Sequence, residues 1–442
     1  MKSSEPHAPR ATPAGAGPDK GPGRPRPVSE AGAPSPVIYA GLIAPERVDP
    51  DAVKVLKRLT RSGHTAYLVG GGVRDLLLGR SPKDFDIATS ARPNEVRRLF
   101  RNCRVIGRRF RLAHILFGAK IIEVATFRRD PTQGEPLVNF DEEGESPSAW
   151  PAPKERGDDA DLLIRQDNVF GLPHEDAIRR DFTINGLFYD IEREEVIDYI
   201  GGVRDLRERV VRTIGEPDVR FREDPIRILR AIKFSARLDL GIAPEVYDAM
   251  VDLRDELSRS APPRVLEEIL RLLRGGAAER SISLAWDVGA LGVLLPELTA
   301  HIEDQADDAE RLWDRLLAVD ALHADGRLPS DAVLISALLE GPLHEAMLGV
   351  RDPAAAFDEF FGEMIGRLPL PRRMRDRMRL VLAAQRRLER GQVGTLKRRE
   401  LFPDAAHLFE LRLRALGRGI PDWLYDYEQR ELPPPRRGSV RG

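Results

Sequence analysis

Cysteine is almost absent from the sequence, since Cys103 is the only one among 442 residues. A disulfide within the chain needs two cysteines and a cysteine-based zinc site needs several, so both are excluded. The eight histidines are scattered along the chain without the spacing of metal ligands. Disulfide exchange and zinc chemistry are therefore not expected of this protein.

Long apolar stretches are missing as well. No window approaches the roughly 20 apolar residues that a membrane-spanning helix needs. The first residues, MKSSEPHAPRATPAGAG, lack the apolar core of a secretory signal. We therefore predict a cytoplasmic protein without a membrane span.

An excess of charge of one sign is also lacking. The formal net charge is −2, from 69 Lys and Arg against 71 Asp and Glu. A nucleic-acid surface must therefore come from the sorting of charges along the fold and not from overall basicity. With 42 % hydrophobic residues, a chain of this length can bury two or three cores of ordinary size, so we expect several domains.

The N-terminal half divides into a tail and a mixed domain. Residues 1–47 are predicted to be a disordered tail, because they are rich in Pro, Gly, Ala and Ser. Residues 48–200 mix short strand-like and helical runs, which predicts an α+β head on a small sheet. Its first helix is expected to begin at Pro50 with Asp49 as N-cap. Residues 130–162 are polar, acidic and rich in Pro and Gly, so a mobile loop is predicted there.

The rest of the sequence has mainly helical spacing of its apolar residues. Examples are RVLEEILRLLRGG, DAVLISALLEG and HLFELRLRAL. We divide this part into a helical neck of residues 201–298, a helical body and tail of residues 299–430, and a short basic tail of residues 431–442. An all-helical region is therefore expected to follow the α+β head.

Two carboxylates stand at alternate positions of the strand-like run DFDIAT. In a strand, Asp84 and Asp86 project to the same side while Phe85 and Ile87 face the core. Two carboxylates this close repel each other unless a cation sits between them. Mg²⁺ fits, because it is held by one or two carboxylates together with substrate phosphates. The alternative is an exposed edge strand whose aspartates pair with nearby arginines.

Three glycines precede this run. Gly70, Gly71 and Gly72 follow the strand-like AYLV and lead into the helical VRDLLLG, so backbone N–H groups can approach an anion closely. The turn is not a P-loop, because no GK[ST] follows, and it is not a dinucleotide fingerprint, because Asp75 stands where the last glycine would be. The turn suits a triphosphate, and the alternative is an ordinary tight turn.

The string GGGVRDLLLG, followed by SPK and DFD, resembles the signature of the DNA polymerase β-like nucleotidyltransferase superfamily. The class is the one that holds bacterial tRNA nucleotidyltransferases and bacterial poly(A) polymerases. The resemblance continues through four further blocks, residues 121–128, 175–185, 198–206 and 222–238. It covers roughly residues 66–295 and weakens beyond.

This resemblance implies a polymerase β-like head with a small mixed sheet, followed by an all-helical neck, body and tail. It implies that Asp84 and Asp86 hold two Mg²⁺ ions and act in catalysis. We expect a third carboxylate to assist them, and favour Asp176 over Glu123. At the incoming nucleotide we expect Gly71, Gly72, Arg74, Arg180, Asp181 and Asn185. An arginine fork suits phosphate and a carboxylate suits sugar hydroxyls. The alternative for residues 175–185 is a surface helix with ion pairs.

The block EDPIR is the most informative about the base. In the family an E-D-x-x-R motif acts as a protein template, which assigns Asp224 and Arg227 to nucleotide binding, and we expect Arg230, three residues further on, to bind the nucleotide as well. A carboxylate accepts from the exocyclic amine of adenine or cytosine, while an arginine donates to the neighbouring ring nitrogen. Uracil and guanine present the reverse pattern, so ATP or CTP is predicted. The alternative is a helix with Asp224 as N-cap and Pro225 at its first position, whose basic stripe extends to Lys233.

The choice between adenylation and CCA addition depends on another segment. Residues 102–118 resemble the corresponding segment of bacterial poly(A) polymerases more than that of CCA-adding relatives. Its Arg108, Arg109 and Arg111 form a predicted cationic patch beside the sheet that could hold RNA or triphosphate. The alternative is a solvated strand edge.

The resulting hypothesis is an enzyme that adenylates RNA 3′ ends, with ATP as substrate, Mg²⁺ as cofactor and RNA as partner. Neither DNA nor a nucleic-acid template is expected, because the protein itself reads the base. Arg372, Arg373 and Arg377 in the helical body are candidates for RNA contacts, or else a solvated face. Two alternatives stay open: a CCA-adding or A-adding tRNA nucleotidyltransferase, and a catalytically inactive RNA-binding scaffold.

Overall fold

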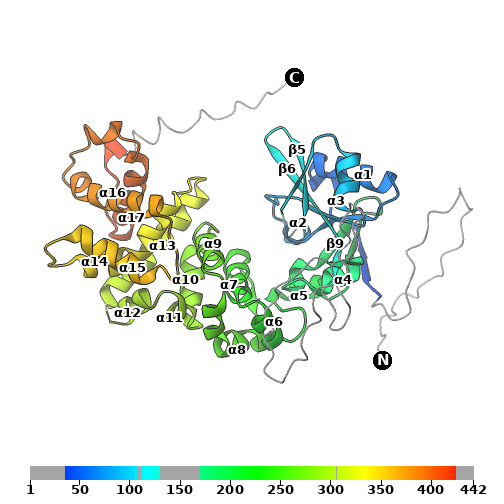
Figure 1. Cartoon of the computed structure of the whole chain (residues 1–442), viewed down its shortest axis with the longest axis horizontal. Helices are drawn as coiled ribbons and strands as arrows, with labels where there is room; N and C mark the ends of the chain where they lie inside the picture. Colours follow the sequence, from blue (N-terminus) through cyan, green and yellow to red (C-terminus); the bar gives the residue numbers. More distant parts are fainter. Residues whose placement is uncertain (1–34, 108–110, 130–168, 305, 425–442) are drawn as a thin grey trace, which may run out of the picture. The chain divides into compact units, whose positions relative to one another are not determined.

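A computed structural model of the chain describes residues 35–107, 111–129, 169–304 and 306–424 (Figure 1). Within these ranges, no helix is both long enough and apolar enough to cross a membrane. The cytoplasmic location stays a prediction.

The predicted N-terminal tail is too long. Three segments of the predicted tails and loop lie outside the described residues: residues 1–34, 130–162 and 431–442. Residues 37–47, however, belong to the head. Strand β1 (Val37–Ala40) pairs antiparallel with β10 (Glu195–Asp198), and a short 3-10 helix, Pro45–Arg47, follows. The run VIYA consists of β-branched and aromatic residues followed by alanine, which fit a strand once a neighbouring strand offers its backbone groups.

The head is built on one eight-stranded mixed sheet, as predicted. In spatial order the strands are β1, β10, β9 (Leu187–Asp190), β2 (Ala66–Val69), β3 (Asp86–Thr89), β6 (Lys120–Thr126), β5 (Leu112–Phe117) and β4 (Cys103–Ile106). Neighbours run antiparallel except β3 and β6, which are parallel. A separate small sheet pairs β7 (Arg128–Arg129) with β8 (Val169–Phe170).

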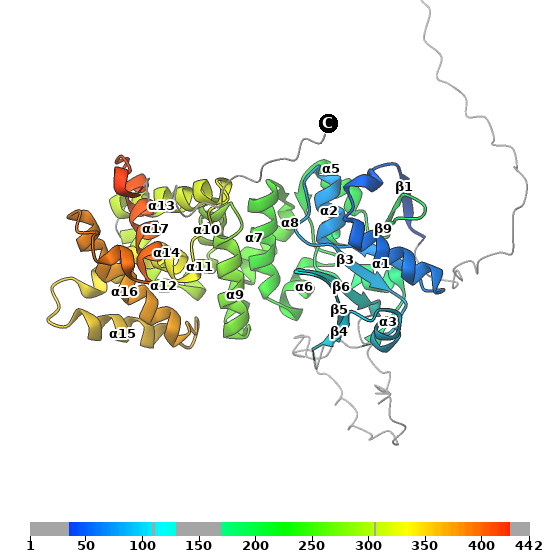
Figure 2. The ribbon, with the colours of Figure 1, turned by 90° about the horizontal axis from the view of Figure 1, so that it is seen from above.

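One face of the eight-stranded sheet packs against the main hydrophobic core. Side chains such as Leu68, Ile87 and Ile122 belong to the same buried core as the apolar stripe of helix α1 (Pro50–Arg61) and Val96 of α3 (Pro93–Leu99). Figure 2 shows both helices beside these strands. This face anchors the sheet to the rest of the head.

The opposite face changes character from one edge to the other. Toward β9 and β2 it carries Val69, Ala88 and Phe188, which form a separate buried apolar cluster. Toward β6, β5 and β4 the same face carries polar and exposed residues. Because strand residues alternate between faces, Asp86 shares a face with Ala88 and lies where the apolar part meets the polar part.

Helix α1 begins where the sequence predicts it. An Asp49 carboxylate oxygen accepts hydrogen bonds from the backbone N–H groups of Asp51 (2.9 Å) and Ala52 (3.2 Å). Pro50 is the first helical residue, where its missing N–H costs nothing.

The chain after the sheet is mainly helical, as predicted. Helix α4 (Pro173–Ile178) precedes β9, and the helices after β10 are α5 (Gly202–Glu208), α6 (Pro217–Glu223), α7 (Ile226–Leu238), α8 (Pro244–Asp252), α9 (Pro262–Leu273), α10 (Ala278–Asp287), α11 (Ala290–Leu294), α12 (Pro296–Asp304), α13 (Ala306–Ala324), α14 (Asp331–Met347), α15 (Pro353–Met364), α16 (Arg372–Glu389) and α17 (Phe402–Ala415). Short 3-10 turns and a two-residue strand pair, β11 (Val210–Val211) with β12 (Gly241–Ile242), complete it.

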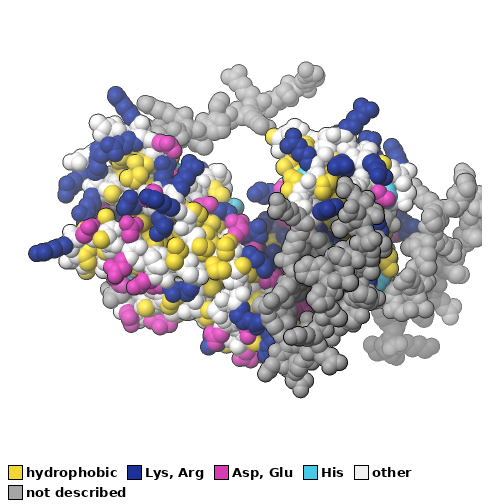
Figure 3. Space-filling view, viewed as in Figure 1, with side chains coloured by type: hydrophobic (Ala, Val, Ile, Leu, Met, Phe, Trp, Pro, Cys, Tyr) yellow, Lys and Arg dark blue, Asp and Glu magenta, His cyan; other side chains and the backbone are white. Residues whose placement is uncertain are grey.

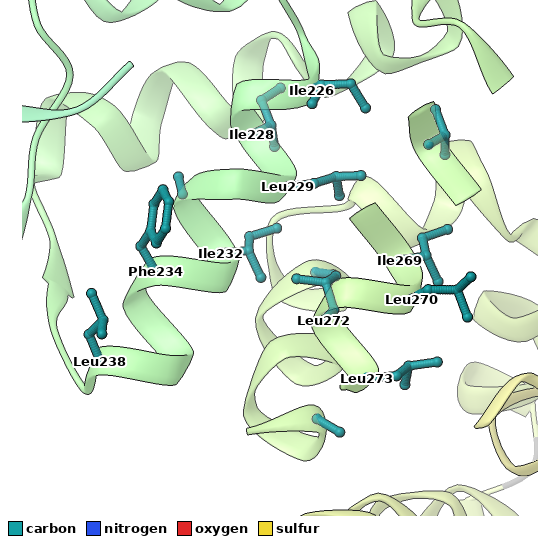
Figure 4. Packing of buried hydrophobic residues seen from close by; sticks show 14 of the residues in the cluster. Ile226, Ile228, Leu229, Ile232, Phe234, Leu238, Ile269, Leu270, Leu272 and Leu273 are labelled. Atoms are coloured by element: carbon teal, nitrogen blue, oxygen red, sulfur yellow. The ribbon is translucent and has the colours of Figure 1, made fainter. Parts of the chain in front are cut away.

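Helices α7 and α9 pack against each other through their apolar faces. Leu229 and Ile232 of α7 lie near Ile269 and Leu272 of α9 (Figure 4), and all four are buried. Full burial of each such side chain stabilises the fold by about 1.5–3 kcal/mol. This packing fixes α7, which carries residues of the predicted nucleotide site.

The predicted start of α7 is one residue too early. Pro225 occupies the N-cap position, and the helix begins at Ile226. Asp224 is instead the C-cap of α6, and its side chain makes no capping hydrogen bond. Its extended backbone (φ −150°, ψ 91°) agrees with the steric restriction that a following proline imposes. The Asp224 carboxylate therefore does not cap a helix and can accept hydrogen bonds from other groups.

Candidate active site

The two predicted metal ligands lie at the start of β3. Asp86 is its first residue, whereas Asp84 precedes the strand and is exposed, so only one of the pair lies in the strand. Ile87 is buried and Phe85 packs against the core, as predicted. In the described part of the chain, neither aspartate has a hydrogen bond or an ion pair with a basic side chain. The alternative of an ion-paired strand edge is therefore not supported.

Glu123 lies beside Asp86 on the neighbouring strand. Ile87 is aligned with Val124 in the parallel pair β3–β6, so Asp86 and Glu123 are neighbours on the same face. Burial, followed by the charges of Glu123 and Asp84, raises the pKa of Asp86 to about 6. A bound cation would relieve this repulsion.

These carboxylates do not form a complete metal site by themselves. The described residues contain no group of three His, Cys, Asp or Glu side chains that could hold a metal ion. This agrees with Mg²⁺ sites in which substrate phosphates supply the remaining ligands. The residues present therefore fit a metal ion that binds together with a nucleotide.

The glycine turn brings Arg180 and Asp84 to the same place. Gly70 has φ +65°, and a Cβ there would lie 3.1 Å from an Arg180 guanidinium nitrogen. A Cβ on Gly72 would lie 3.5 Å from the Asp84 carbonyl oxygen. Glycine is needed at position 70, because a side chain is strained at this φ and would crowd Arg180. The turn opens the short helix α2 (Gly71–Leu77).

Arg180 is held in place by three neighbouring groups. Its guanidinium lies over the Phe188 ring at 5.5 Å and donates to the backbone oxygen of Asn185 at 3.2 Å. It also donates to one carboxylate oxygen of Asp176, at 2.7 and 3.2 Å. The cation is thus fixed beside Gly70, where it can meet a phosphate.

The contacts of Asp176 do not fit the predicted role of a third metal carboxylate. Its second carboxylate oxygen accepts from the Arg179 guanidinium at 2.7 and 3.0 Å and from the backbone N–H of Arg128 at 3.2 Å. Burial acts to raise the pKa of Asp176, but Arg180 and Arg179 outweigh it and hold this pKa below its usual value. Both oxygens are engaged, so Asp176 positions arginines, and Glu123 is left as the candidate third carboxylate.

Asp181 connects the head to α7. One of its carboxylate oxygens accepts from the backbone N–H of Phe182 (2.8 Å) and from the Asn185 amide (3.0 Å). The other accepts from the Arg230 guanidinium at 2.7 Å. Burial acts against ionisation, but Arg230 and these hydrogen bonds hold the pKa of Asp181 far below its usual value. Asp181 is therefore a charged, buried link between two elements of the site.

Arg74 is a buried neighbour of the Asp181–Arg230 pair, because Asn185 contacts both Arg74 and Asp181. Its side chain is 3 % exposed, donates to Asp75 and to the Asn185 amide oxygen (2.7 Å), and lies 5.0 Å from the centre of the Phe234 ring. A Cβ on Gly71 would lie 3.6 Å from it. Arg74 thus supports the glycine turn from within, and its predicted triphosphate contact stays a prediction.

The base-reading candidates lie at the junction of α6 and α7. Asp224 accepts from the Arg264 guanidinium at 2.9 Å, and Arg227 donates to Glu223 and to the Arg220 backbone oxygen, both at 2.8 Å. The two predicted partners are not bonded to each other. The charge of Asp181, with a smaller contribution from Asp224, raises the pKa of Arg230, so Asp224 and Arg230 share one electrostatic environment.

The predicted basic stripe on α7 is neutralised by acids. Arg227 pairs with Glu223, Arg230 pairs with Asp181, and Lys233 donates to Glu268 at 2.7 Å. Burial, followed by the nearby Arg230, lowers the pKa of Lys233 to about 8. These basic side chains therefore form ion pairs within the protein and are not a solvated face.

Comparison of the chain with known proteins identifies its family. Residues 66–212 match the family described as "Poly A polymerase head domain", and residues 239–302 match "Probable RNA and SrmB- binding site of polymerase A". The chain is 38 % identical to poly(A) polymerase I of Salmonella typhi over 419 aligned residues. The alignment covers 90 % of this chain and 86 % of that protein. The chain belongs to the poly(A) polymerase family.

Other members of the wider class are also similar. Poly(A) polymerase I of Escherichia coli O157:H7 is 40 % identical over 79 % of this chain and 74 % of its own length. The CCA-adding enzyme of Geobacillus stearothermophilus is 33 % identical over 61 % of this chain and 60 % of its own length. A solved structure of the Bacillus stearothermophilus CCA-adding enzyme with CTP matches with a TM-score of 0.63 and 26 % identity, over 87 % of this chain and 82 % of that one. The predicted fold and family are confirmed.

The three arginines of the helical body that are candidates for RNA contacts differ in their surroundings. Arg372 and Arg373 are exposed, whereas Arg377 donates to Asp404 at 2.5 Å and therefore ties α16 to α17. Figure 3 shows Lys and Arg side chains gathered over the C-terminal helices. In the other predicted cationic patch, residues 108–110 lie outside the described residues and Arg111 is exposed.

Sequence reasoning gave Glu123 second place and missed His114. Both interrupt apolar strands, between Ile122 and Val124 and between Ala113 and Ile115. A polar residue flanked by buried neighbours in a strand points to the opposite face. That pattern is the signal that could have found them.

Proposed function

We propose that the chain transfers AMP from ATP to the 3′-hydroxyl of RNA and releases pyrophosphate. The attacking 3′-oxygen forms a bond to the α-phosphorus, and the bond from that phosphorus to the bridging oxygen of pyrophosphate breaks. The observation that carries the proposal is the carboxylate cluster at the start of β3, beside the glycine turn and Arg180. Membership of the poly(A) polymerase family supplies the reaction class.

We propose that Asp84 and Asp86 hold Mg²⁺, with Glu123 as the third carboxylate. The raised pKa of Asp86 and the lack of basic partners for the two aspartates in the described chain support a cation there. When bound, Mg²⁺ lowers the pKa of the attacking hydroxyl and neutralises charge on the leaving oxygens.

The remaining residues bind and orient the nucleotide. Gly71 and Gly72 let the backbone approach the triphosphate closely, and Arg180 meets its charge. Asp181 holds Asn185 and Arg230 in place on the predicted ribose side of the pocket, and the Asp181–Arg230 pair keeps this side fixed relative to α7. Asp176 holds the Arg180 guanidinium in its orientation.

Base selection is proposed for Asp224 and Arg227. The Asp224 side chain is 23 % exposed and pairs with the more exposed Arg264, so part of its polar edge is open to a base. Adenine offers an amine donor beside a ring acceptor, which matches a carboxylate beside an arginine. The same pattern in cytosine keeps the CCA-adding alternative open.

The purified protein is expected to add long A tails to a generic RNA with ATP and Mg²⁺, and not to add C from CTP. The assay compares labelled ATP and CTP on two primers, an unstructured RNA and a tRNA lacking its CCA end. Incorporation of CTP onto that tRNA would instead identify a CCA-adding enzyme. Failure to incorporate either nucleotide with Mg²⁺ or Mn²⁺ would identify an RNA-binding scaffold.

Replacing Asp224 by alanine is expected to weaken base selection before it weakens triphosphate binding. The preference for ATP over GTP and UTP, measured as the ratio of kcat/KM values, should fall by about tenfold, because a rejected base no longer leaves this carboxylate unpaired. Arg264→Ala is the matched control, since it removes the partner of Asp224 but not the carboxylate. An unchanged selectivity in Asp224→Ala would leave Asp224 with a structural role.

A further inference from the structure

A row of polar side chains crosses the sheet on the face that carries Asp86. Strand register aligns Asp86 of β3 with Glu123 of β6, Glu123 with His114 of β5, and His114 with Arg104 of β4. Aligned residues of neighbouring strands point to the same face, so these four side chains form one continuous row. The row runs from the predicted catalytic centre to the edge of the sheet.

The contacts within the row agree with this register. His114 Nε2 lies 3.5 Å from a carboxylate oxygen of Glu123, and the His114 side chain is 18 % exposed. Arg104 is exposed and has no acidic partner in the described part of the chain. On the same face beside the row, Ile106 and Ile121 are 49 % and 44 % exposed. The face therefore offers a cation and apolar surface together.

The triphosphate side of the site lies in the other direction from Asp86. The glycine turn follows directly after β2, and Arg180 lies over Phe188 of β9. The strand order β9, β2, β3, β6, β5, β4 places these groups on one side of Asp86 and the row on the other.

In-line phosphoryl transfer requires the attacking and leaving oxygens to lie on opposite sides of the phosphorus. Pyrophosphate leaves on the side of the glycine turn and Arg180. The RNA 3′-hydroxyl must therefore enter from the side of β6 and β5, where Glu123 and His114 lie. Exposed Arg104 at the edge then faces the phosphates that follow along the RNA.

We infer that the face of β6, β5 and β4 is the subsite for the 3′-terminal nucleotide of the RNA, with His114 and Arg104 as its positioning residues. This inference rests on the proposed function. With Nε2 of His114 directed toward Glu123, the other ring nitrogen, Nδ1, is left to form a hydrogen bond with a ribose hydroxyl. Arg104 binds a backbone phosphate, and Ile106 and Ile121 offer apolar surface to the terminal base.

The test measures separate kinetic constants for RNA and for ATP. His114→Ala is expected to lower kcat/KM for an RNA primer by about 10- to 100-fold, because the attacking hydroxyl is no longer positioned. The KM for ATP should stay at the wild-type value. His114→Gln keeps an N–H donor toward Glu123 and should recover most of the loss. His64→Ala, which removes another half-buried histidine of the head, is the matched control.

Arg104→Ala provides a second, independent arm on an exposed side chain that folding does not need. Its KM for RNA should rise, and the slope of log affinity against log salt concentration should fall by about one, as for one lost phosphate contact. Arg193→Ala, an exposed arginine at the β9–β10 turn, should change neither.

The outcomes separate this inference from the function on which it rests. If the wild-type protein extends RNA and Asp86→Asn does not, but His114→Ala and Arg104→Ala extend RNA with wild-type constants, the subsite is wrong and the function stands. An equal loss for RNA and ATP in both variants would also overturn the subsite. If His114→Ala does not fold, the result for Arg104→Ala decides the question.

Discussion

Asp86→Asn is expected to abolish extension of RNA by ATP, with a loss of at least about 1000-fold in kcat, because metal assistance contributes several kcal/mol to the transition state. Asparagine has nearly the same shape but no charge, so the fold should persist. The measurement is single-turnover extension of a labelled RNA at saturating ATP and Mg²⁺. Retained activity would remove Asp86 from the metal site.

The stability of Asp86→Asn should show that the carboxylate serves function and not folding. The folded pKa of about 6 lies above the unfolded value of about 3.9. Between these values the folded state binds more protons at Asp86, so the contribution of this residue to the free energy of unfolding falls as pH rises from about 4 to 6. Without divalent cations, the variant should lack this fall and be at least as stable at pH 7.

A matched substitution controls for the loss of one carboxylate. Asp248→Asn removes an exposed acid of α8 outside the carboxylate cluster, and both its activity and its stability should equal those of the wild type. If Asp248→Asn were as inactive as Asp86→Asn, the loss would reflect net charge and not the site.

Asp181→Ala is expected to lower the free energy of unfolding by about 2–3 kcal/mol and to abolish nucleotide binding. The substitution leaves Arg230, Asn185 and the Phe182 N–H without their partner. A broken buried ion pair is costly, and partial exposure of Arg230 moderates that cost. Denaturant unfolding and binding of a fluorescent ATP analogue measure the two effects.

The pH dependence of this loss has a defined sign. The pKa of Asp181 is lower in the folded state than in the unfolded state, so its stabilisation is complete above about pH 4 and is lost as the pH falls. The difference in free energy of unfolding between wild type and Asp181→Ala should therefore shrink between pH 7 and pH 3. A constant difference would show that Asp181 acts through packing alone.

A double substitution separates structure from function at this link. Asp181→Leu with Arg230→Met replaces the pair by apolar side chains of similar size, which often restores stability. The double variant should unfold near the wild-type free energy and still fail to bind ATP. Glu208→Ala, which breaks an exposed pair with Arg204, should change stability by less than about 0.5 kcal/mol. Recovery of ATP binding in the double variant would contradict a nucleotide-binding role for the pair.

Local sequence patterns were sufficient to predict features that depend on a single helix, strand or turn. The cap at Asp49, the strand that buries Ile87 and the glycine turn before α2 all depend on neighbours within a few residues. The α7 start was missed by one residue because Asp224 follows α6 directly and completes that helix instead. The sequence shows Pro225, but it does not show whether Asp224 ends the preceding helix or caps the following one.

Roles that depend on partners distant in the chain were predicted less well. Asp176 and Glu123 are both acids near suitable motifs, and nothing in the sequence tells which one faces Asp86. The fold decides it, because α4 directs Asp176 toward two arginines while the parallel register of β3 and β6 sets Glu123 beside Asp86. The pairing of Arg377 could not be predicted for the same reason, since its partner Asp404 lies on another helix.

The sequence by itself determined the family, the α+β head with its helical continuation, the carboxylate pair and the glycine turn, because these are encoded in short runs with fixed spacing. Only the tertiary structure decided which charges neutralise one another and which face of the sheet stays polar. The physical reason is that charge pairing and the alternation of strand faces depend on register between strands and helices far apart in the chain. The row from Asp86 to Arg104 exists only because four strands align.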